Sequence, residues 1–385
     1  MPTRARGGAL VRVAADGVPG LPAIDLGIGA VTALVGPRGS GKSQLLGSIA
    51  WLLKGRPSIA PAGAAVRVSG ELDGTTEPVR FTRSSEVGLA FDSGRATALP
   101  ACSFLRARGR LRPEADRSGS VSRRMTELTG DATSDAVAAE ALVAAVEACC
   151  DDCVTHEMLL IEEPELLLTP QAQRYLYRLL RTFAEGGNQV VYSTRSPAFL
   201  DAAHHDEIIR LDLRRGRRSI RRTRPGALSD AARVRLAAEF DHERSEMFFA
   251  RSVVLVEGQT ERLALPFIFR AMGHDPDAAG IAIVEVGGKS NLPLAARLLG
   301  DLGIPFVLVF DADRGPASAA LDAEIRRAGG AAPAIRLEPD FEGVAGIASH
   351  TDKVLHAWNR FASPRPAGVP PALAAIVRSA FDQRA

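Results

Sequence analysis

Residues 31–53 read VTALVGPRGSGKSQLLGSIAWLL and join an apolar, β-rich segment to a glycine loop and then to apolar residues at helical spacing. The loop fits G-x-x-x-x-G-K-S, and a strand before it and a helix after it are the context in which this pattern binds phosphate. Backbone N–H groups and the helix N-terminus would face phosphate oxygens, the lysine would reach the β- and γ-phosphates, and the serine would hold Mg²⁺. The stretch predicts ATP binding through Gly36, Gly39, Ser40, Gly41, Lys42 and Ser43; the alternative is a glycine-rich turn with an incidental lysine.

A second apolar segment, EMLLIEEPELLLTP at residues 157–170, ends in acids after a strand expected over residues 158–161. We expect Glu162 to coordinate Mg²⁺ and Glu163 to polarise the attacking water. A solvated helix start is the alternative for this acidic pair.

A further strand and a polar loop are expected in NQVVYSTRSPAFLD, residues 188–201. In ABC-type ATPases, which this half of the chain resembles, such a loop carries a histidine near the γ-phosphate. Here Arg195 holds that position, and its charge could still meet the phosphate. An ABC signature is not evident, since the SGS at residues 118–120 is a poor match.

The second half of the chain alternates strand and helix. SVVLV (252–256), IAIVEV (281–286) and FVLVF (306–310) predict strands, with helical segments between them. This alternation predicts a parallel sheet. Sites in such sheets lie beyond the carboxyl ends of the strands.

Carboxylates follow two of these strands. Glu257 ends the first strand and Glu261 lies one helical turn later, while Asp311 and Asp313 follow the third strand in VFDADRG. Four carboxylates in one cleft repel each other unless cations hold them. Oxygen ligands favour Mg²⁺ or Mn²⁺, which can activate water and stabilise a leaving oxygen in phosphodiester cleavage.

This arrangement resembles the Toprim domain. Together with the features of the first half, the segments FFARSVVLVEGQTE, VGGKSN and VFDADRG resemble the OLD (overcoming lysogenization defect) family of ATP-dependent nucleases, from about residue 8 to about residue 345. The resemblance implies an α/β fold with an ABC-type P-loop NTPase domain followed by a Toprim domain with a Rossmann-like parallel sheet. It also implies divalent-metal-dependent DNA cleavage, often in phage defence. The domains would be an ATPase domain (1–226), a helical connector (227–250), a Toprim nuclease domain (251–350) and a tail with a short helix (351–385).

The resemblance also assigns site residues. Glu257, Glu261, Asp311 and Asp313 match the metal carboxylates, and in LEPDFEGV Glu342 is a further ligand, with Asp340 a weaker match. Lys289 in GGKSN would neutralise developing phosphate charge; the alternative is a solvated lysine at a helix start. The expected catalytic residues are therefore Glu163, Glu257, Asp311 and Lys289. The chain departs from the family at Arg195 and in its short length, so an inserted dimerisation domain would be reduced or missing.

Composition agrees with a globular protein. The 385 residues are 46% hydrophobic and 24% charged, with a net charge of +2, so any basic surface that attracts DNA must be local. No apolar run suits a signal peptide or a membrane span, and four cysteines do not make a disulfide framework in a chain of this length, so we expect a cytoplasmic protein. CCDDCVTH at residues 149–156 could be read as a zinc site, but the helical run before it favours packing cysteines.

Seven arginines lie between Arg214 and Arg224. We expect Arg214, Arg215, Arg217 and Arg218 to contact DNA from the exposed turn of a hairpin, although the same residues would suit a plain solvent-exposed turn. Further expected partners are a second copy of the chain, in a homodimer or higher oligomer, and a second defence protein.

Three functions compete. The leading one is an ATP-regulated, metal-dependent DNA endonuclease. The second is a nucleotide-switched sensor or scaffold of a defence complex whose Toprim domain does not cut, which the degenerate signature and Arg195 favour. The third, a topoisomerase-like or primase-like enzyme, is disfavoured because the three tyrosines (Tyr175, Tyr177 and Tyr192) all lie in the ATPase half.

Overall fold

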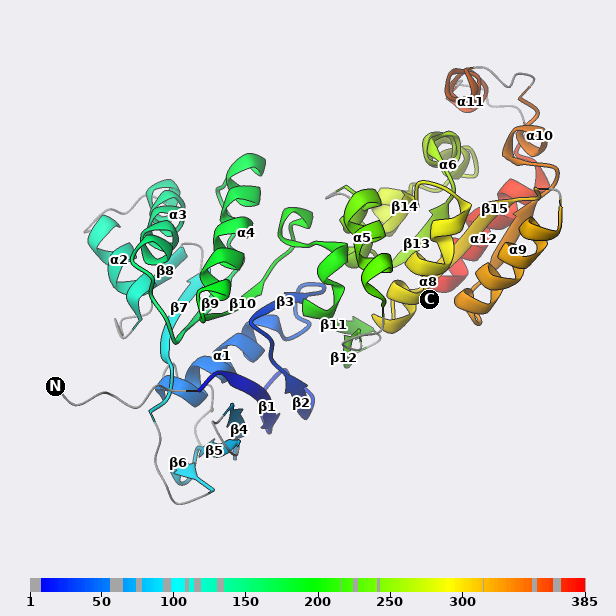
Figure 1. Cartoon of the computed structure of the whole chain (residues 1–385). Coiled ribbons are helices and arrows are strands. Elements are labelled where there is room, and N and C mark those ends of the chain that lie inside the picture. Colours follow the sequence, from blue (N-terminus) through cyan, green and yellow to red (C-terminus); the bar gives the residue numbers. More distant parts are fainter. Residues whose placement is uncertain are drawn as a thin grey trace. The chain divides into compact units, whose positions relative to one another are not determined.

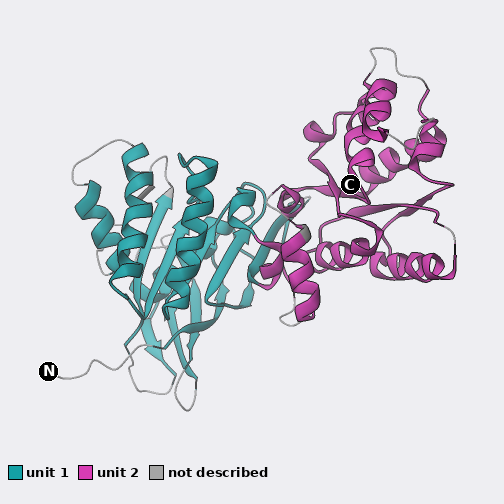
Figure 2. Cartoon of the chain, turned by 45° about the horizontal axis from the view of Figure 1, so that its top comes forward, with its two compact units in different colours: residues 1–200, 207–221 teal, residues 201–206, 222–385 magenta. Residues whose placement is uncertain are grey.

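The computed structural model describes most of the chain. The described residues are 8–55, 65–73, 78–92, 98–107, 111–113, 119–129, 135–214, 216–223, 228–240, 243–313, 315–347, 352–362 and 368–384. They form two compact units, one of residues 1–200 and 207–221 and one of residues 201–206 and 222–385 (Figure 2). No helix among the described residues is both long and apolar enough to cross a membrane.

The first unit contains a seven-stranded sheet with the order β12-β11-β3-β10-β9-β7-β8 (Figure 1). Its five inner strands are parallel, and they bring the glycine loop after β3 next to the acids after β9 and the polar loop after β10. The strand bounds are β3 Val31–Val35, β7 Ala101–Ala107, β8 Leu111–Pro113, β9 Glu157–Glu162, β10 Gln189–Ser193, β11 Ile208–Arg214 and β12 Arg217–Arg222.

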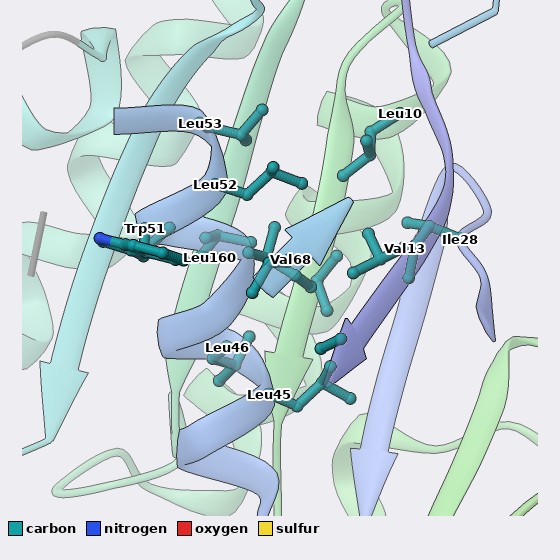
Figure 3. Packing of buried hydrophobic residues seen from close by; sticks show 14 of the residues in the cluster. Leu10, Val13, Ile28, Leu45, Leu46, Trp51, Leu52, Leu53, Val68 and Leu160 are labelled. Carbon is teal, nitrogen blue, oxygen red and sulfur yellow. The ribbon is translucent and has the colours of Figure 1, made fainter. Parts of the chain in front are cut away.

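A second, antiparallel sheet has the order β2-β1-β4-β5-β6. Its strands are β1 Leu10–Asp16, β2 Ile24–Gly27, β4 Arg67–Leu72, β5 Val79–Ser84 and β6 Gly88–Phe91. Helix α1 (Lys42–Lys54) packs between the sheets, and Leu45, Leu46 and Leu52 point from it into a core that Val13 and Val68 of this sheet and Leu160 of β9 complete (Figure 3). The core fixes the helix whose first residues belong to the glycine loop.

Three further helices complete the first unit: α2 (Ser120–Thr129), α3 (Asp135–Asp151) and α4 (Pro170–Glu185). The Thr169 side chain caps α4 by accepting from the Ala172 N–H at 3.3 Å. Cys149 is buried in α3, as the helix-packing interpretation predicts, whereas Cys150 is half-buried and Cys153 is exposed.

The second unit is built on a four-stranded, wholly parallel sheet with the order β14-β13-β15-β16. The strands are β13 Ser252–Val256, β14 Ile281–Glu285, β15 Phe306–Asp311 and β16 Ala334–Leu337. The predicted parallel sheet is therefore present, with strand ends within one residue of the predicted ones. The α-helices of this unit are α5 Asp230–Glu239, α6 Gln259–Ala271, α7 Pro276–Ala279, α8 Leu292–Asp301, α9 Pro316–Gly329, α10 Phe341–Ala345, α11 Lys353–Phe361 and α12 Pro371–Arg384. Four short 3-10 turns are also present: η1 Pro197–Phe199, which lies in the first unit, η2 Ala202–Glu207, η3 Arg244–Phe249 and η4 Lys289–Asn291.

Helices α6 and α12 cover one face of this sheet. Val254 and Val256 of β13 pack with Leu265 of α6 and with Ile376 and Val377 of α12 in one buried cluster. Helix α9 covers the opposite face, where Gly329 comes so close to Leu308 that a Cβ would lie 2.6 Å from its Cδ1. The C-terminal helix is thus part of the core that supports the strand-end carboxylates.

Candidate active sites

The glycine loop has the conformation of a phosphate cradle. Gly36 has a φ of 137°, and a Cβ there would lie 1.8 Å from the Leu211 carbonyl oxygen, so only glycine fits. Lys42 Nζ turns back to donate to the carbonyl oxygens of Gly36 at 2.6 Å and Pro37 at 3.0 Å. The Ser40 hydroxyl is buried and has no hydrogen-bond partner among the described residues. The Lys42 ammonium is thus held by carbonyl oxygens of the loop, whereas the Ser40 hydroxyl is free to bind a ligand.

Burial, together with the charge of Arg195, lowers the pKa of Lys42 to about 8, although Glu163 and Glu165 oppose the shift. The Lys42 ammonium is stabilised when a phosphate binds, because the negative phosphate oxygens replace the hydration that burial removes. The residues present therefore fit a nucleotide triphosphate with its Mg²⁺.

The acids after β9 face the same cavity. Glu162 is the last, buried residue of β9, and Glu163 follows with a φ of 47°, a left-handed conformation that is uncommon for a residue with a side chain. The Glu163 N–H donates to the Ser193 carbonyl oxygen at 2.9 Å. Arg195 Nη2 lies 2.7 Å from Glu163 Oε1, so the arginine pairs with the acid that was expected to polarise water.

Glu165 was not foreseen as a site residue. Its carboxylate accepts from Thr194 Oγ1 at 3.0 Å and from the Arg195 N–H at 2.7 Å, which fixes the loop that carries Arg195. Burial raises its pKa, and these hydrogen bonds oppose the rise. The only sequence signal was its place in the same EEPE motif.

A cavity of about 450 Å³ brings most of the expected nucleotide-site residues together. Gly36 and Ser40 are not among its lining residues. The cavity is lined by Arg38, Gly39, Gly41, Lys42, Ser43, Gln44, Glu162, Glu163 and Arg195.

The second unit gathers carboxylates at the carboxyl ends of β13 and β15. Glu257 Oε1 accepts from the Asp311 N–H at 2.8 Å, and Asp311 Oδ1 accepts from the Phe341 N–H at 2.9 Å. Glu261 lies in the first turn of α6 and Glu342 in the first turn of α10, and each is 6% exposed. Glu342 Oε1 lies 2.9 Å from Lys353 Nζ.

These carboxylates act on one another electrostatically. Burial, together with repulsion from Asp311, Glu257 and Glu342, raises the pKa of Glu261 to about 8. Burial likewise raises the pKa of Asp311 to about 7, with repulsion from Glu257 and Glu342, and it raises the pKa of Glu257. A bound cation would relieve this burial and repulsion, so the donor set suits Mg²⁺ or Mn²⁺.

The side chains do not yet converge on one point. Among the described residues, no group of three or more histidine, cysteine, aspartate or glutamate side chains is arranged to hold a metal ion. Ligation therefore requires the carboxylates to rotate towards one another.

The remaining expected ligands have other contacts. The Asp313 carboxylate is 59% exposed and pairs with Lys289 Nζ at 3.1 Å. Asp340 is the N-cap of α10, where its Oδ1 accepts from the Gly343 N–H at 2.7 Å. Lys289 is buried rather than solvated at a helix start, and its ammonium also contacts Asp322, which the sequence did not single out.

The arginine-rich segment is a hairpin, as expected, because β11 and β12 are neighbours in the sheet. Arg217 and Arg218 are exposed at the start of β12. Arg214 Nε lies 2.8 Å from the Asp212 carboxylate, which offsets part of its charge. Arg215 lies outside the described residues.

Comparison with known proteins adds family matches to both units. Residues 248–313 match the TOPRIM domain of overcoming lysogenization defect protein-like proteins, a range that contains Glu257, Glu261, Lys289, Asp311 and Asp313. Residues 137–201 match an AAA domain family that takes in a proposed AbiEii toxin of a type IV toxin–antitoxin system.

Curated relatives align with parts of the chain. It is 41% identical over 177 residues to the OLD nuclease of Thermus scotoductus, covering 44% of this chain and 33% of that protein. It is 29% identical over 164 residues to the Old nuclease of Escherichia phage P2, covering 41% of this chain and 28% of that protein. The alignments thus span a third or less of the length of these relatives. The lipoprotein-releasing system ATP-binding protein LolD of Anaeromyxobacter dehalogenans is 31% identical over 218 residues, covering 50% of this chain and 82% of LolD.

Solved structures have lower overall similarity. The SMC head domain from Thermotoga maritima is 15% identical with a TM-score of 0.39 and covers 56% of this chain and 100% of that one. The C-terminal region of the Burkholderia pseudomallei OLD protein is 17% identical with a TM-score of 0.27 and covers 36% of this chain and 100% of that one.

Proposed function

We propose that the chain, which matches the TOPRIM domain of OLD-like proteins and an AAA domain family and aligns in part with two OLD nucleases, is an ATP-regulated, divalent-metal-dependent DNA endonuclease. The observation that carries the proposal is the group of buried, mutually repelling carboxylates at the strand ends of the second unit. Burial and mutual repulsion raise the pKa values of Glu261 and Asp311 to about 8 and about 7, so without a cation these acids hold protons near neutral pH, and a divalent cation would let them ionise together.

In the first unit, Lys42 would leave the loop carbonyls for the β- and γ-phosphates, and Ser43 and Glu162 would hold Mg²⁺. Glu163 would orient the attacking water. Its present partner Arg195, at 2.7 Å, would be drawn to the γ-phosphate, so ATP would release the acid that ATP hydrolysis needs.

In the second unit, Glu257, Glu261, Asp311 and Glu342 would hold Mg²⁺ or Mn²⁺. The bound ion would supply a Lewis acid and lower the pKa of a water molecule beside the scissile phosphate. The backbone bonds to Glu257 and Asp311 keep these two carboxylates at the carboxyl ends of the strands, and Glu261 and Glu342 are themselves buried.

The proposal extends to the partners of the chain. The exposed Arg217 and Arg218 suit contact with DNA phosphates. Arg215 would suit the same contact, and so would Arg214, although Asp212 offsets part of its charge. Family resemblance supports a homodimer or higher oligomer, a second defence protein as partner, a cytoplasmic location and a role in phage defence.

A supercoiled-plasmid nicking assay tests the proposal. Wild type should nick the plasmid with Mg²⁺ or Mn²⁺, Asp311→Ala should lower the rate at least ~100-fold while ATP hydrolysis persists, and Lys42→Ala should abolish ATP binding. Lanes with and without ATP give the direction of control. Nicking that survives Asp311→Ala would refute the assignment of the metal site, and ATP binding that survives Lys42→Ala would refute that of the nucleotide site.

The second candidate is a nucleotide-switched sensor or scaffold whose Toprim unit binds without cutting. It is favoured by the carboxylates that do not yet converge on an ion and by the Arg195 pair that replaces the usual histidine. Wild type that binds DNA and hydrolyses ATP but never nicks, even with Mn²⁺, would select this candidate.

A further inference from the structure

Helices α6 and α11 of the second unit pack side by side and carry an exposed apolar surface (Figure 1). Val354, Leu355 and Trp358 lie on one face of α11 and are 40%, 55% and 47% exposed. Ala357 and Phe361, on the neighbouring face of the helix, are buried in the core with residues of α6. Apolar side chains that are grouped in this way outside the core mark a surface that binds a partner.

An aromatic pair joins the two helices. The ring centroids of Phe267 in α6 and Trp358 in α11 are 5.0 Å apart, with an angle of 80° between the ring planes. In such an edge-to-face contact Phe267 covers at most one face of the indole. The Arg270 guanidinium lies 5.8 Å from the centroid of the Phe267 ring. A cation beside an indole with an open face is the combination that stacks on a nucleic-acid base and meets its phosphate.

The surface begins at the strand-end carboxylates. Phe267 follows Glu261 by six residues of α6, which is about 9 Å along the helix. Trp358 follows Lys353 by five residues of α11, and Lys353 Nζ lies 2.9 Å from Glu342 Oε1. The nucleotides of one DNA strand are about 3.4 Å apart along a duplex, so the aromatic pair is two or three nucleotides away from the carboxylates.

The charge of the two helices favours an anionic partner. Apart from the buried Glu261, every charged side chain of α6 and α11 is basic: Arg262, Arg270, Lys353 and Arg360. Arg262 and Arg270 pair with exposed acids, and such pairs are weak enough for phosphate to compete. A second copy of the chain bound symmetrically through this surface would bring basic helices against each other.

We propose that this surface binds an unpaired DNA strand beside the carboxylates, with one base stacked on Trp358. Val354 and Leu355 contact the neighbouring nucleotides, and Lys353 and Arg270 contact their phosphates. The bases of an intact duplex are already stacked on each other, so DNA with unpaired nucleotides is the preferred substrate. The inference rests on the proposed function, since it names the form of DNA that the second unit takes.

The test uses the fluorescence of Trp358 in the full chain. Trp51→Phe removes the one other tryptophan, so the signal then comes from Trp358 alone. The probe is an oligothymidylate of about 12 nucleotides with phosphorothioate linkages, which resist cleavage, and a blunt duplex of the same length is the comparison. In this background Trp358→Phe keeps an aromatic ring, whereas Trp358→Leu keeps an apolar side chain without a ring, and their affinities for the probe are measured by anisotropy. Tyr175→Ala is the control, because it removes a 37% exposed aromatic side chain of the first unit.

We expect a saturable loss of Trp358 fluorescence with the single strand and little change with the duplex. Trp358→Leu should bind the single strand at least about tenfold more weakly than Trp358→Phe, and Tyr175→Ala should bind it as tightly as the protein without that change. If the Trp358 variants do not fold, the fluorescence of Trp358 itself decides.

Single-strand binding without a fluorescence change, or equal affinities for Trp358→Leu and Trp358→Phe, would overturn the inference. So would a dimer in analytical ultracentrifugation that Trp358→Leu dissociates, because the surface would then bind a second copy. Nicking of plasmid without a fluorescence change on single-strand binding would leave the proposed function standing and the inference refuted. A loss of fluorescence with the single strand, in a protein that never nicks plasmid, would refute the proposed function and keep the DNA-binding surface.

Discussion

Glu261→Gln should make the second unit more stable at pH 8 in the absence of metal, although it removes an expected ligand. The pKa of Glu261 is raised from 4.5 to about 8 by burial and then by neighbouring carboxylates. The unfolded chain therefore loses this proton near pH 4.5, while the folded chain keeps it to about pH 8. Between those values the folded state binds more protons, so the free energy of unfolding falls as pH rises.

The size of the effect follows from the same shift. Each pH unit corresponds to ~1.4 kcal/mol, so a rise from 4.5 to about 8 sets an upper limit of ~5 kcal/mol. Structural relaxation around a buried charge reduces such costs, and we expect a gain of about 1–3 kcal/mol for the glutamine at pH 8. At pH 4.5 and below, where both states carry the proton, the variant and wild type should be equally stable.

Unfolding in EDTA from pH 4.5 to pH 8.5 measures this difference. The chain has one tryptophan in each unit, so Trp51→Phe leaves Trp358 to report on the second unit alone. Asp277→Asn is the control, because its carboxylate is 87% exposed and should leave the pH profile unchanged. Mg²⁺ should stabilise wild type at pH 8 and the glutamine variant much less. Parallel pH profiles for wild type and Glu261→Gln would refute the reasoning.

Three further predictions concern the core and the nucleotide site. Ile376→Ala in α12 should lower the free energy of unfolding of the second unit by about 2–4 kcal/mol in denaturant titrations. Leu355→Ala, whose side chain is 55% exposed, should change it little, and equal effects of the two substitutions would contradict the placement of α12. Gly36→Ala should abolish binding of labelled ATP, because its Cβ would lie 1.8 Å from a carbonyl oxygen. Gly187→Ala is the control, because Gly187 has a φ of 87° but open surroundings, and it should still bind ATP. Unchanged ATP affinity in Gly36→Ala would contradict the assignment of the glycine loop as the phosphate site. Arg195→Ala should weaken ATP binding about tenfold and leave ADP binding unchanged in calorimetry, since only a γ-phosphate competes with Glu163 for the guanidinium; an equal loss for ATP and ADP would place Arg195 elsewhere.

The sequence predicted the parts of the fold that short-range patterns encode. Strands β3, β9, β13, β14 and β15 are apolar runs that end at glycine or at a charged residue, and β10 ends at the polar Ser193 and Thr194. All six lie within a residue or two of the expected bounds. Because parallel strands bring their carboxyl ends to one edge, the contact between Glu257 and Asp311 followed from topology alone.

Tertiary contacts explain what the sequence did not reveal. The antiparallel sheet of the first unit has short strands of mixed polarity, such as Arg67–Leu72. The alternation of buried and exposed side chains in these strands can be recognised only once the core that they cover is known. Asp322 lies in α9, far along the chain from Lys289, and no local motif links the two. Glu165 looked like one more acid in a motif until its bonds to Thr194 and Arg195 were visible.

The most direct test of the central claim is the initial rate at which the chain nicks supercoiled plasmid at pH 8 with Mn²⁺, for wild type and for Asp311→Asn, which keeps the side-chain size and the acceptor for the Phe341 N–H. The strand-end carboxylates predict metal-dependent nicking by wild type, loss in EDTA, and a rate at least ~100-fold lower for the asparagine variant. Equal nicking by the two proteins, or nicking that persists in EDTA, would contradict the account.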